Sequence, residues 1–383
     1  MSEWKEYKLG EICDVRDGTH DSPKASLEGY PLVTSKNIKD GKIDLSNTYL
    51  ISENDYKFVN QRSNVEQWDI LYSMIGTIGE CAIVKDVPQF AIKNVGLFKT
   101  NGNKILARWI YYYLQSSIAL KELDGRIKGS TQQYISLTDL REFPIMIPPI
   151  EEQNQIVGVL SSLDDKIDLL NRENATLEAL AETLFRHYFI ENPDPTWKEG
   201  KLGEVCYYVT DKIDAAGLDR HSYISTENML NEKKGVTDAS SIPDNIRVTK
   251  YVVGDVLVSN IRPYFKKIWF ADRNGGCSND VLCIRAVNKE IENFVYYTLR
   301  QDDFFDYVML GSKGCKMPRG DKQHIMNWQI SVPDKGALTI FNEQVSTSIK
   351  KIKLNQQQIQ ILSTQRDTLL PRLMSGEVKV KGQ

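Results

Sequence analysis

The fold is decided by Trp4-Lys5-Glu6-Tyr7-Lys8-Leu9-Gly10-Glu11-Ile12-Cys13, which returns as Trp197-Lys198-Glu199-Gly200-Lys201-Leu202-Gly203-Glu204-Val205-Cys206. A repeat of this length is typical of a polypeptide that contains two similar domains. We therefore expect a duplicated fold, and we expect function on a duplicated surface.

The repeat extends along most of the chain. Three further pairs of segments match, namely Thr34-Ser35-Lys36-Asn37-Ile38 with Ser225-Thr226-Glu227-Asn228-Met229, Asp69-Ile70-Leu71-Tyr72-Ser73 with Asp255-Val256-Leu257-Val258-Ser259, and Trp109-Ile110-Tyr111-Tyr112-Tyr113-Leu114 with Phe294-Val295-Tyr296-Tyr297-Thr298-Leu299. The segments between them differ in length and content. Two copies of one scaffold are therefore expected to carry two different binding surfaces.

Composition places the chain among ordinary globular proteins. Its 383 residues are 41% hydrophobic, with a net charge of -3, and are enough for two or three domains with two cores. No stretch approaches the roughly 20 apolar residues of a membrane span, and no leader pattern opens the chain, so we expect a cytoplasmic protein without membrane contact. The six cysteines form no C-x-x-C pair and the four histidines are far apart in sequence. Reduced, mostly buried thiols and no metal site are expected.

Two segments carry the heptad spacing of coiled coils. The first follows Pro148-Pro149 and ends before Asn192-Pro193-Asp194-Pro195, and proline cannot continue a helix there. Its seam, spaced by fours and threes, is Ile156, Leu160, Leu163, Ile167, Leu170, Asn174, Leu177, Ala181 and Leu184. Such a helix of roughly 35 to 40 residues would be about 55 Å long.

The second seam comprises Phe341, Val345, Ser348, Ile352, Asn355, Ile359, Leu362, Arg366, Leu369 and Leu373, with Pro371 expected to bend the last turn. Residues 151–186 hold eight acids and three bases, whereas 341–375 hold five bases and two acids. Opposite charge favours pairing of the two helices with each other. Asn174 either fixes the register of this pair or is a chance polar residue, and the polar seam positions Asn355 and Arg366 leave room for contact with another protein.

Signatures of common enzymes are absent from the sequence. It contains no G-x-x-x-x-G-K-[ST], G-x-G-x-x-G or G-x-S-x-G motif, and Ile147-Pro148-Pro149-Ile150 lacks the polar residue and the aromatic ring of an amino-methyltransferase motif. Pro193-Asp194 with Glu199-Gly200-Lys201 imitates a metal-dependent nuclease pattern, but the other copy, at Glu6 and Lys8, has no preceding Pro-Asp. A self-contained methyltransferase or nuclease is therefore not expected.

Two polar loops occupy matching places, each shortly before a strand-like run, Phe143–Ile147 or Trp328–Val332. Viewed alone, each is more simply a solvated surface loop, but their matched positions favour contact with DNA, because basic, amide and hydroxyl groups contact phosphates and base edges. The expected DNA-binding residues in the first half are Lys36, Asn37, Thr77, Lys128, Ser130, Thr131, Gln132, Gln133 and Tyr134. In the second half they are Asn228, Asn260, Arg262, Tyr264, Lys266, Lys267, Lys313, Lys316, Arg319, Lys322 and Gln323.

The chain resembles the specificity subunits of type I restriction-modification systems over essentially its whole length. The most characteristic stretch is the strand-to-helix junction Phe143-Pro144-Ile145-Met146-Ile147-Pro148-Pro149-Ile150-Glu151-Glu152-Gln153-Asn154-Gln155-Ile156-Val157, with a degenerate copy at Val332-Pro333 and Asn342-Glu343-Gln344. Shorter similar pieces are Asp17-Gly18-Thr19-His20, Gly76-Thr77-Ile78-Gly79, Asn260 to Lys267, Gly276-Cys277-Ser278-Asn279-Asp280 and Ser375-Gly376-Glu377-Val378. The second junction departs from the family pattern because it lacks the double proline.

The resemblance implies an α/β (α+β) chain with two target-recognition domains, 1–148 and 197–333, separated by two long antiparallel coiled-coil helices, 149–190 and 334–377. A linker at 191–196 and a tail at 378–383 complete it. It also implies a non-catalytic subunit that reads a bipartite, asymmetric target in double-stranded DNA. Two methyltransferase subunits and restriction/translocase subunits would dock on the helices. S-adenosylmethionine, ATP and Mg²⁺ would bind to those partners, and no cofactor to this chain.

A rigid spacer between two readers suits half-sites about one DNA turn apart, near 34 Å. Because the net charge is slightly negative, we expect weak DNA affinity from this chain alone and tight binding with its partners. The rival hypothesis is a coiled-coil scaffold that binds only proteins.

Overall fold

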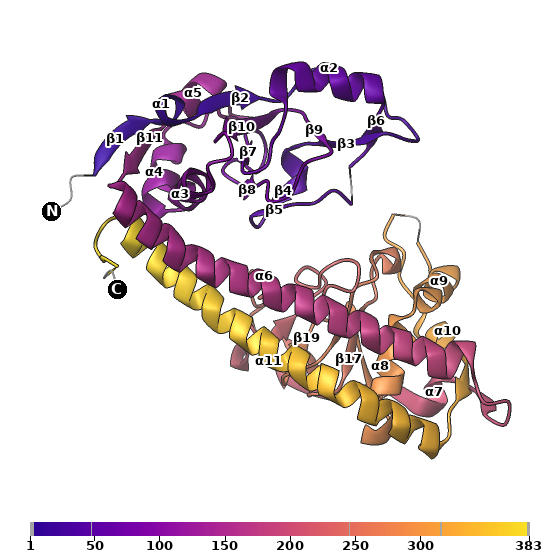
Figure 1. Cartoon of the computed structure of the whole chain (residues 1–383). Coiled ribbons are helices and arrows are strands. Elements are labelled where there is room, and N and C mark those ends of the chain that lie inside the picture. Colours follow the sequence, from indigo (N-terminus) through magenta and orange to yellow (C-terminus); the bar gives the residue numbers. More distant parts are fainter. Residues whose placement is uncertain (1–3, 47, 245, 315, 381–383) are drawn as a thin grey trace. The chain divides into compact units, whose positions relative to one another are not determined.

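In the computed structural model, each copy of the opening repeat forms a short strand followed by a one-turn helix. These are β1 (Lys5–Lys8) with α1 (Leu9–Ile12), and β12 (Lys198–Lys201) with α7 (Leu202–Val205) (Figure 1). The structure describes residues 4–46, 48–244, 246–314 and 316–380. Both copies of the repeat therefore fold in the same way.

A glutamate three residues after the last strand residue starts each of these helices. Its carboxylate accepts the backbone N–H of Lys8 or Lys201 at 2.9 Å in both copies. The leucine that begins each helix, Leu9 or Leu202, is fully buried, and its N–H donates to Phe143 O at 2.8 Å in the first copy and to Trp328 O at 2.9 Å in the second. The repeated sequence thus joins the beginning of each globular part to its end.

The two strand-like runs before the long helices are confirmed as strands. β11 (Pro144–Ile147) pairs antiparallel with β1, and β21 (Gln329–Val332) pairs antiparallel with β12. Each pair forms a two-stranded sheet of its own.

A four-stranded sheet forms the centre of each globular part, and its strand order is the same in both. In the first, the order β2-β10-β7-β8 corresponds to Asp14–Asp17, Val95–Lys99, Ile70–Ser73 and Cys81–Ile83. In the second, the order β13-β20-β17-β18 corresponds to Cys206–Tyr208, Val281–Ala286, Val256–Ser259 and Ile268–Phe270. The matched segments that begin at Asp69 and Asp255 thus supply equivalent central strands.

A buried aspartate precedes each of these central strands. Asp69 accepts from Lys99 Nζ at 2.9 Å, and Asp255 accepts from Arg285 Nε at 2.7 Å and NH2 at 2.8 Å. Burial raises the pKa of Asp69, and the hydrogen bond from Lys99 opposes that shift. The partner base comes from β10 or β20, so the pair ties two neighbouring strands together.

Smaller sheets differ between the two parts. The first part has the three-stranded sheet β6-β3-β9 (Leu50–Ile51, Tyr30–Val33, Ala91–Ile92) and the hairpin β4-β5 (Ile38–Lys39, Lys42–Ile43). The second part has the four-stranded sheet β14-β16-β19-β15 (Lys212–Asp214, Arg247–Tyr251, Gly275–Cys277, Tyr223–Ile224). The same scaffold therefore carries different peripheral elements.

Helices complete each part in a common order. The first part has α2 (Glu53–Ser63), α3 (Lys104–Leu114), α4 (Ser117–Asp124) and α5 (Leu137–Arg141). The second has α8 (Glu292–Arg300), α9 (Asp302–Leu310) and α10 (Lys322–Met326), which correspond in order to α3, α4 and α5. The helices α3 and α8 come from the matched aromatic segments of the sequence.

Both predicted long helices are present. α6 spans Ile150–Arg186 and ends in a π-helical turn, His187–Glu191, and α11 spans Lys335–Met374 with Pro371 inside it. Contacts divide the chain into two units, one up to Leu169 together with the residues from Gln358 on, the other Leu170–Gln357. Each unit therefore contains one globular part and one end of each long helix, and the predicted domain limits remain predictions. No helix within the described ranges is long and apolar enough to cross a membrane.

The two long helices pair antiparallel, as their charges predict. In the first unit, Arg366 NH1 donates to Asp164 Oδ1 at 3.0 Å, and in the second, Lys351 Nζ lies 3.5 Å from Glu173 Oε1. Every predicted seam residue is buried or half-buried. The polar seam residue Arg366 is thus used within the helix pair.

Asn174 and Asn355 meet in the helix interface of the second unit. Asn355 Nδ2 donates to Asn174 Oδ1 and to Glu173 Oε2, each at 2.9 Å, and the two asparagines are 9% and 1% exposed. A buried amide pair of this kind favours one register, because a slip would leave both groups without partners.

We expect Asn174→Leu to lower the free energy of unfolding by about 1 to 3 kcal/mol, because Asn355 then keeps only Glu173 as a partner. The double variant Asn174→Leu/Asn355→Leu should recover most of that loss, since leucine suits both seam positions. Urea denaturation of the single and double variants, read as a double-mutant cycle, measures the coupling. Strictly additive losses would show that the two amides do not act as a pair.

The cysteines agree with the expectation of buried thiols. Cys13, Cys81, Cys206, Cys277 and Cys283 are free and buried, while Cys315 lies outside the described residues. Burial is the main cause that raises the pKa of Cys13 and of Cys206 to about 12, so neither thiol is poised for chemistry.

Candidate nucleic-acid interface

In each unit, two loops that are distant in sequence contact each other. The contacts are equivalent in the two units. The first loop pair comprises residues 74–80, after β7, and 127–135, before α5. Ile75 bridges to Tyr134, and Ile135 N donates to Met74 O at 3.0 Å.

The second loop pair comprises residues 260–267, after β17, and 311–320, before α10, except Cys315. Ile261 bridges to Arg319, and Gly320 N donates to Asn260 O at 3.3 Å. Sequence analysis matched only the later loop of each pair, and the structure confirms that match and adds the earlier loop.

The later loop of each pair closes with the same pair of backbone hydrogen bonds. Lys128 and Tyr134 exchange N–H to O bonds of 2.9 Å and 2.9 Å, and Lys313 and Arg319 exchange bonds of 3.0 Å and 3.0 Å. The later loop is therefore closed at its base by the same backbone bonds in both units.

Each of these lysines also pairs with an aspartate at the start of the next helix. Lys128 Nζ lies 2.6 Å from Asp139 Oδ2, and Lys313 Nζ lies 3.0 Å from Asp321 Oδ2. The backbone N–H of His324 and the Lys313 ammonium hold the pKa of Asp321 at about 2. The two aspartates are therefore ionised at neutral pH and orient the base of each turn.

The earlier loops place a left-handed residue at equivalent positions. Gly76 has φ of 80° and Arg262 has φ of 50°. Their N–H groups both point to the later loop, from Gly76 to Gln133 O at 3.4 Å and from Arg262 to Pro318 O at 2.8 Å. A left-handed conformation costs a non-glycine residue roughly 1 to 2 kcal/mol, so the second unit keeps Arg262 there against a local preference for glycine.

Most predicted contact residues of the first half are accessible. Those with exposed side chains are Lys36, Thr77, Lys128, Ser130, Thr131, Gln132, Gln133 and Tyr134. All but Lys36 belong to the first loop pair. Its surface is dominated by amide, hydroxyl and aromatic groups.

The second loop pair is more basic. Arg262, Tyr264, Lys313, Lys316 and Arg319 are exposed, as are Lys322 and Gln323 at the start of α10, whereas Asn260, Lys266 and Lys267 are half-buried.

Internal contacts already hold several of these bases. Lys266 Nζ lies 3.0 Å from Asp302 Oδ1, and Lys267 Nζ donates to Thr226 O at 2.7 Å. The hydrogen bond to Asp302 raises the pKa of Lys266, whereas burial lowers the pKa of Lys267. Lys322 Nζ lies 5.6 Å from the Tyr208 ring centroid. Because Lys266 and Lys267 are half-buried, the exposed cations Arg262, Lys313, Lys316 and Arg319 are better placed for a ligand.

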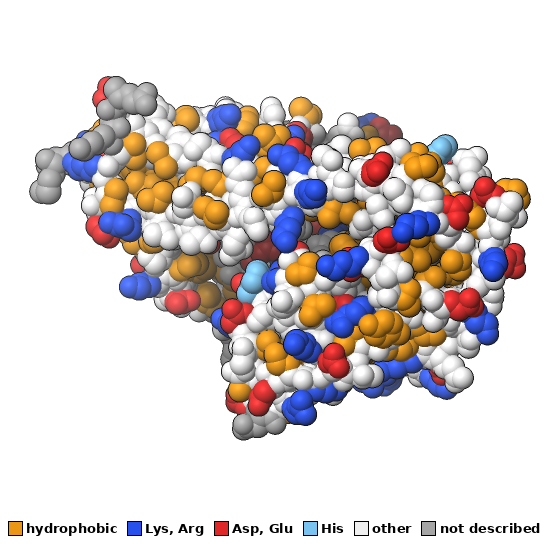
Figure 2. Space-filling model, turned by 90° about the horizontal axis from the view of Figure 1, so that it is seen from below, with side chains coloured by type: hydrophobic (Ala, Val, Ile, Leu, Met, Phe, Trp, Pro, Cys, Tyr) orange, Lys and Arg blue, Asp and Glu red, His pale blue; other side chains and the backbone are white. Residues whose placement is uncertain are grey.

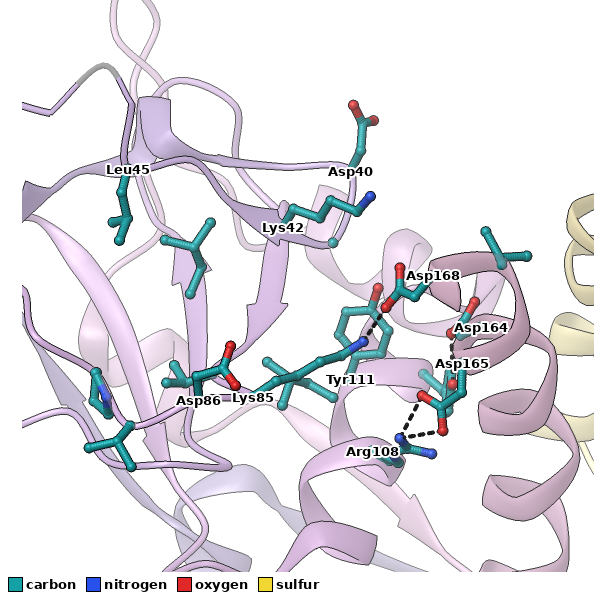
Figure 3. A pocket seen from close by; sticks show the side chains of 18 of the residues that line it. Asp40, Lys42, Leu45, Lys85, Asp86, Arg108, Tyr111, Asp164, Asp165 and Asp168 are labelled. Carbon is teal, nitrogen blue, oxygen red and sulfur yellow. Dashed lines mark hydrogen bonds and ion pairs between the residues drawn. The ribbon is translucent and has the colours of Figure 1, made fainter. Parts of the chain in front are cut away.

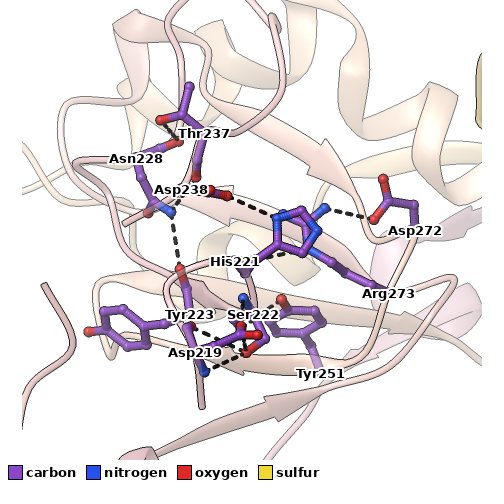
Figure 4. A network of polar contacts seen from close by, with 10 residues as sticks. All are labelled: Asp219, His221, Ser222, Tyr223, Asn228, Thr237, Asp238, Tyr251, Asp272 and Arg273. Atoms are coloured by element: carbon purple, nitrogen blue, oxygen red, sulfur yellow. Dashed lines mark hydrogen bonds and ion pairs between the residues drawn. The ribbon is translucent and has the colours of Figure 1, made fainter. Parts of the chain in front are cut away.

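Asn37 and Asn228, predicted as contact residues, are used by the scaffold instead. Asn37 is 6% exposed, accepts Thr34 N at 2.9 Å and donates to Asp44 O at 3.1 Å. Asn228 is 4% exposed, accepts Ser225 N at 2.6 Å and donates to Thr237 O at 2.7 Å (Figure 4). With their amides occupied in this way, neither asparagine presents a free group to a base edge.

The same network in the second unit holds its peripheral sheet. His221 Nδ1 lies 2.9 Å from Asp238 Oδ1, Arg273 Nε donates to His221 O at 2.9 Å, and Tyr251 OH donates to Ser222 O at 2.9 Å (Figure 4). These bonds connect segments that lie far apart in the sequence. The network therefore holds these backbone segments in place, and its bonds need no ligand to account for them.

Three polar contacts beside the loop pairs were missed by sequence reasoning. His20 Nδ1 lies 2.9 Å from Asn94 Oδ1 in the first unit, and Lys212 Nζ lies 3.2 Å from Asn279 Oδ1 in the second. Arg319 NH2 lies 3.1 Å from Asp280 Oδ1. The sequence did contain one signal for these contacts, because His20, Asn279 and Asp280 lie in the short stretches that resemble the specificity-subunit family.

A cavity of about 710 Å³ lies in the first unit between the β4-β5 hairpin, α3 and α6 (Figure 3). Ion pairs cross it from α3 and from the segment after β8 to α6. Arg108 NH2 contacts both carboxylate oxygens of Asp165 at 2.8 Å, and Lys85 pairs with Asp168. Tyr112 OH donates to Asp164 at 2.7 Å. These contacts fasten the globular part of the first unit to its long helix.

Charge is mixed over the surface. On the face drawn in Figure 2, Lys and Arg side chains are interspersed with Asp and Glu. The mixture of charges on that face agrees with the net charge of -3.

Comparison with known proteins agrees with this architecture. Residues 1–179 match the family model described as Type I restriction modification DNA specificity domain. The chain is 24% identical to the type I restriction enzyme MjaIX specificity subunit of Methanocaldococcus jannaschii, over 99% of this chain and 94% of the relative.

Two other relatives match about half of the chain. The putative MjaX specificity subunit of the same organism is 27% identical over 53% of this chain, and the HindI specificity subunit of Haemophilus influenzae is 28% identical over 50%. These matches span only 50% and 42% of the two relatives. All three relatives are named as specificity subunits of type I restriction enzymes.

A solved structure shows the same fold. The type I restriction-modification S subunit from M. genitalium aligns over 100% of this chain and 97% of its own, with a TM-score of 0.56 and 16% identity. The duplicated globular parts and the two antiparallel helices agree with that fold, and residues 1–179 of this chain match the specificity domain of type I restriction-modification systems.

Proposed function

We propose that this chain selects the DNA sequence on which a type I restriction-modification complex acts. One observation carries the proposal: two loop pairs share their backbone hydrogen bonds but present different side chains. A repeated frame with the exposed Tyr134 in one copy and the exposed Arg319 in the other is suited to reading two different sequences. The proposed target is therefore bipartite and asymmetric double-stranded DNA.

The proposed partners follow from the family. Two methyltransferase subunits and the restriction/translocase subunits would dock on the long helices, bringing S-adenosylmethionine, ATP and Mg²⁺ with them. Exposed apolar side chains on these helices support a docking role, among them Leu169, Leu180, Leu354 and Ile361. No catalytic step is assigned to this chain.

A mobility shift with the chain and its co-expressed methyltransferase subunit on random duplexes tests the proposal. We expect a shift with the complex and little or none with the chain alone, because its own net charge is slightly negative. An assembled complex that binds no DNA would instead support the rival protein scaffold. Methylome sequencing of cells carrying both subunits would then give the recognised sequence.

Arg262 offers a test at one residue. If its guanidinium contacts a base edge, Arg262→Ala should weaken binding of the cognate sequence by about 1 to 3 kcal/mol and relax preference at one position. Arg262→Gly is the matched variant, because glycine adopts the left-handed conformation seen at Gly76 without strain. Affinities of the complex for cognate and singly mismatched duplexes provide the measurement. Equal weakening on every sequence would mean that Arg262 contacts only phosphate.

A further inference from the structure

Arg319 stands at the junction of the second loop pair, where its backbone is held on both sides. Its N–H and C=O both bond to Lys313 at 3.0 Å, and it bridges to Ile261 in the earlier loop. Its side chain nevertheless remains 56% exposed. The backbone of Arg319 is therefore fixed, while its side chain remains accessible.

Asp280 contacts one nitrogen of the Arg319 guanidinium group. Arg319 NH2 lies 3.1 Å from Asp280 Oδ1, and Asp280 is itself anchored because its backbone oxygen accepts Asn260 N at 2.9 Å. Among residues 4–46, 48–244, 246–314 and 316–380, Nε and NH1 of Arg319 have no hydrogen-bond partner. Both two-donor edges of a guanidinium include NH2, so the N–H of NH2 that does not face Asp280 and one neighbouring nitrogen leave a two-donor edge of this exposed group free.

This arrangement suits a base better than a phosphate. A phosphate contact needs positive charge without orientation, and the carboxylate of Asp280 both offsets the charge of Arg319 and would repel a phosphate beside it. An oriented guanidinium instead matches the paired acceptors O6 and N7 of guanine in the major groove. The equivalent residue of the first unit, Tyr134, cannot make that bidentate contact, so this reading would belong to the second unit alone.

We propose that Arg319, positioned by Asp280, recognises a guanine in the part of the target read by the second globular part. This inference rests on the proposed DNA-selecting function. Arg319 makes the contact, and Asp280 acts as a positioning residue that fixes the plane of the guanidinium.

The experiment selects bound duplexes from a random library with the complex of the full chain and its methyltransferase subunit. Variants are Arg319→Gln, Asp280→Ala and Asp280→Asn, the last of which keeps an oxygen acceptor for Arg319. Lys335 and Glu290 form a comparable exposed ion pair, 3.0 Å apart, outside the loop pairs. Lys335→Gln and Glu290→Gln therefore serve as charge-matched controls. Thermal unfolding verifies that each variant is folded.

We expect Arg319→Gln to lower the preference for guanine at one position by about 10- to 100-fold, while the other positions stay as in the wild type. Asp280→Ala should relax the same position while raising affinity for unrelated DNA, because an acid next to the backbone is removed. Asp280→Asn should keep part of the guanine preference. A merely structural role of Asp280 would not produce opposite changes in specificity and non-specific affinity.

Two results would overturn the inference. One is a motif that keeps every position in Arg319→Gln with uniformly weaker binding, which would make Arg319 a phosphate contact. The other is relaxation at a position where the wild type prefers a base other than guanine. If the wild-type complex selects no motif at all, the proposed function itself fails, and that outcome is distinguishable from both.

Discussion

Phe185→Ala is expected to lower the free energy of unfolding by about 3 to 5 kcal/mol, the largest single loss we predict. The side chain is 1% exposed, and its ring centroid lies 5.3 Å from that of Phe189, 5.9 Å from Phe294 and 6.0 Å from Phe341. These rings come from α6 and its π-helical end, from α8 and from α11. Truncation would leave a cavity where the two long helices meet the second globular part.

The loss is measured by urea denaturation of the full chain, with hydrogen exchange in α8 as a local readout. Leu180→Ala on the same helix is the control, because that side chain is 49% exposed and its loss should change stability little. A loss for Phe185→Ala no larger than that of the control would contradict the role of this aromatic cluster. Because Phe185 is outside both loop pairs, this variant tests the stability of the fold separately from the proposed DNA-sequence recognition.

The second large effect concerns DNA binding by the complex. Replacing Lys313, Lys316 and Lys322 together with glutamine should reduce the slope of log affinity against log salt by about 3, since each lost phosphate contact contributes roughly 0.9. At 0.15 M salt the same relation predicts an affinity loss of about 100-fold. All three lysines are exposed, and the loss should be similar on all sequences, because phosphate contacts carry no base information.

Titration of the complex with one duplex between about 50 and 200 mM salt gives the slope. Lys198, Lys289 and Lys335 are exposed lysines of the same unit outside the loop pair, and their triple glutamine variant changes the net charge equally. An equal fall in slope for both triple variants would show that net charge, and not this loop pair, attracts the DNA. Unchanged binding in both would place the phosphate contacts on other subunits.

Local sequence signals were sufficient for the scaffold. The opening repeat predicted two equivalent domains because its glutamate acts on a residue three positions away, as the matching bonds of Lys8 and Lys201 show. Heptad spacing predicted both long helices because the seam depends on neighbouring turns of one helix. The same spacing left the role of Asn174 open, and only its contact with Asn355 decided it.

The candidate interface was only partly predictable. Residue type suggested Asn37 and Asn228 as contacts, but their amides hold the backbone of their own segments. Residue type also made Lys267 and Arg319 look equivalent, although one donates to Thr226 O and the other projects beside Asp280. Composition shows which groups a loop contains, but not which of them already have a partner.

The sequence by itself determined that this chain has two copies of one scaffold and two long paired helices, because repeats, caps and hydrophobic periodicity act over short distances along the chain. Only the tertiary structure decided that residues 74–80 meet 127–135 and that residues 260–267 meet 311–320. The physical reason is that hydrogen bonds between distant strands and loops depend on how the central sheet brings them together. That assembly determines which side chains are held inside and which remain exposed for the proposed contact with DNA.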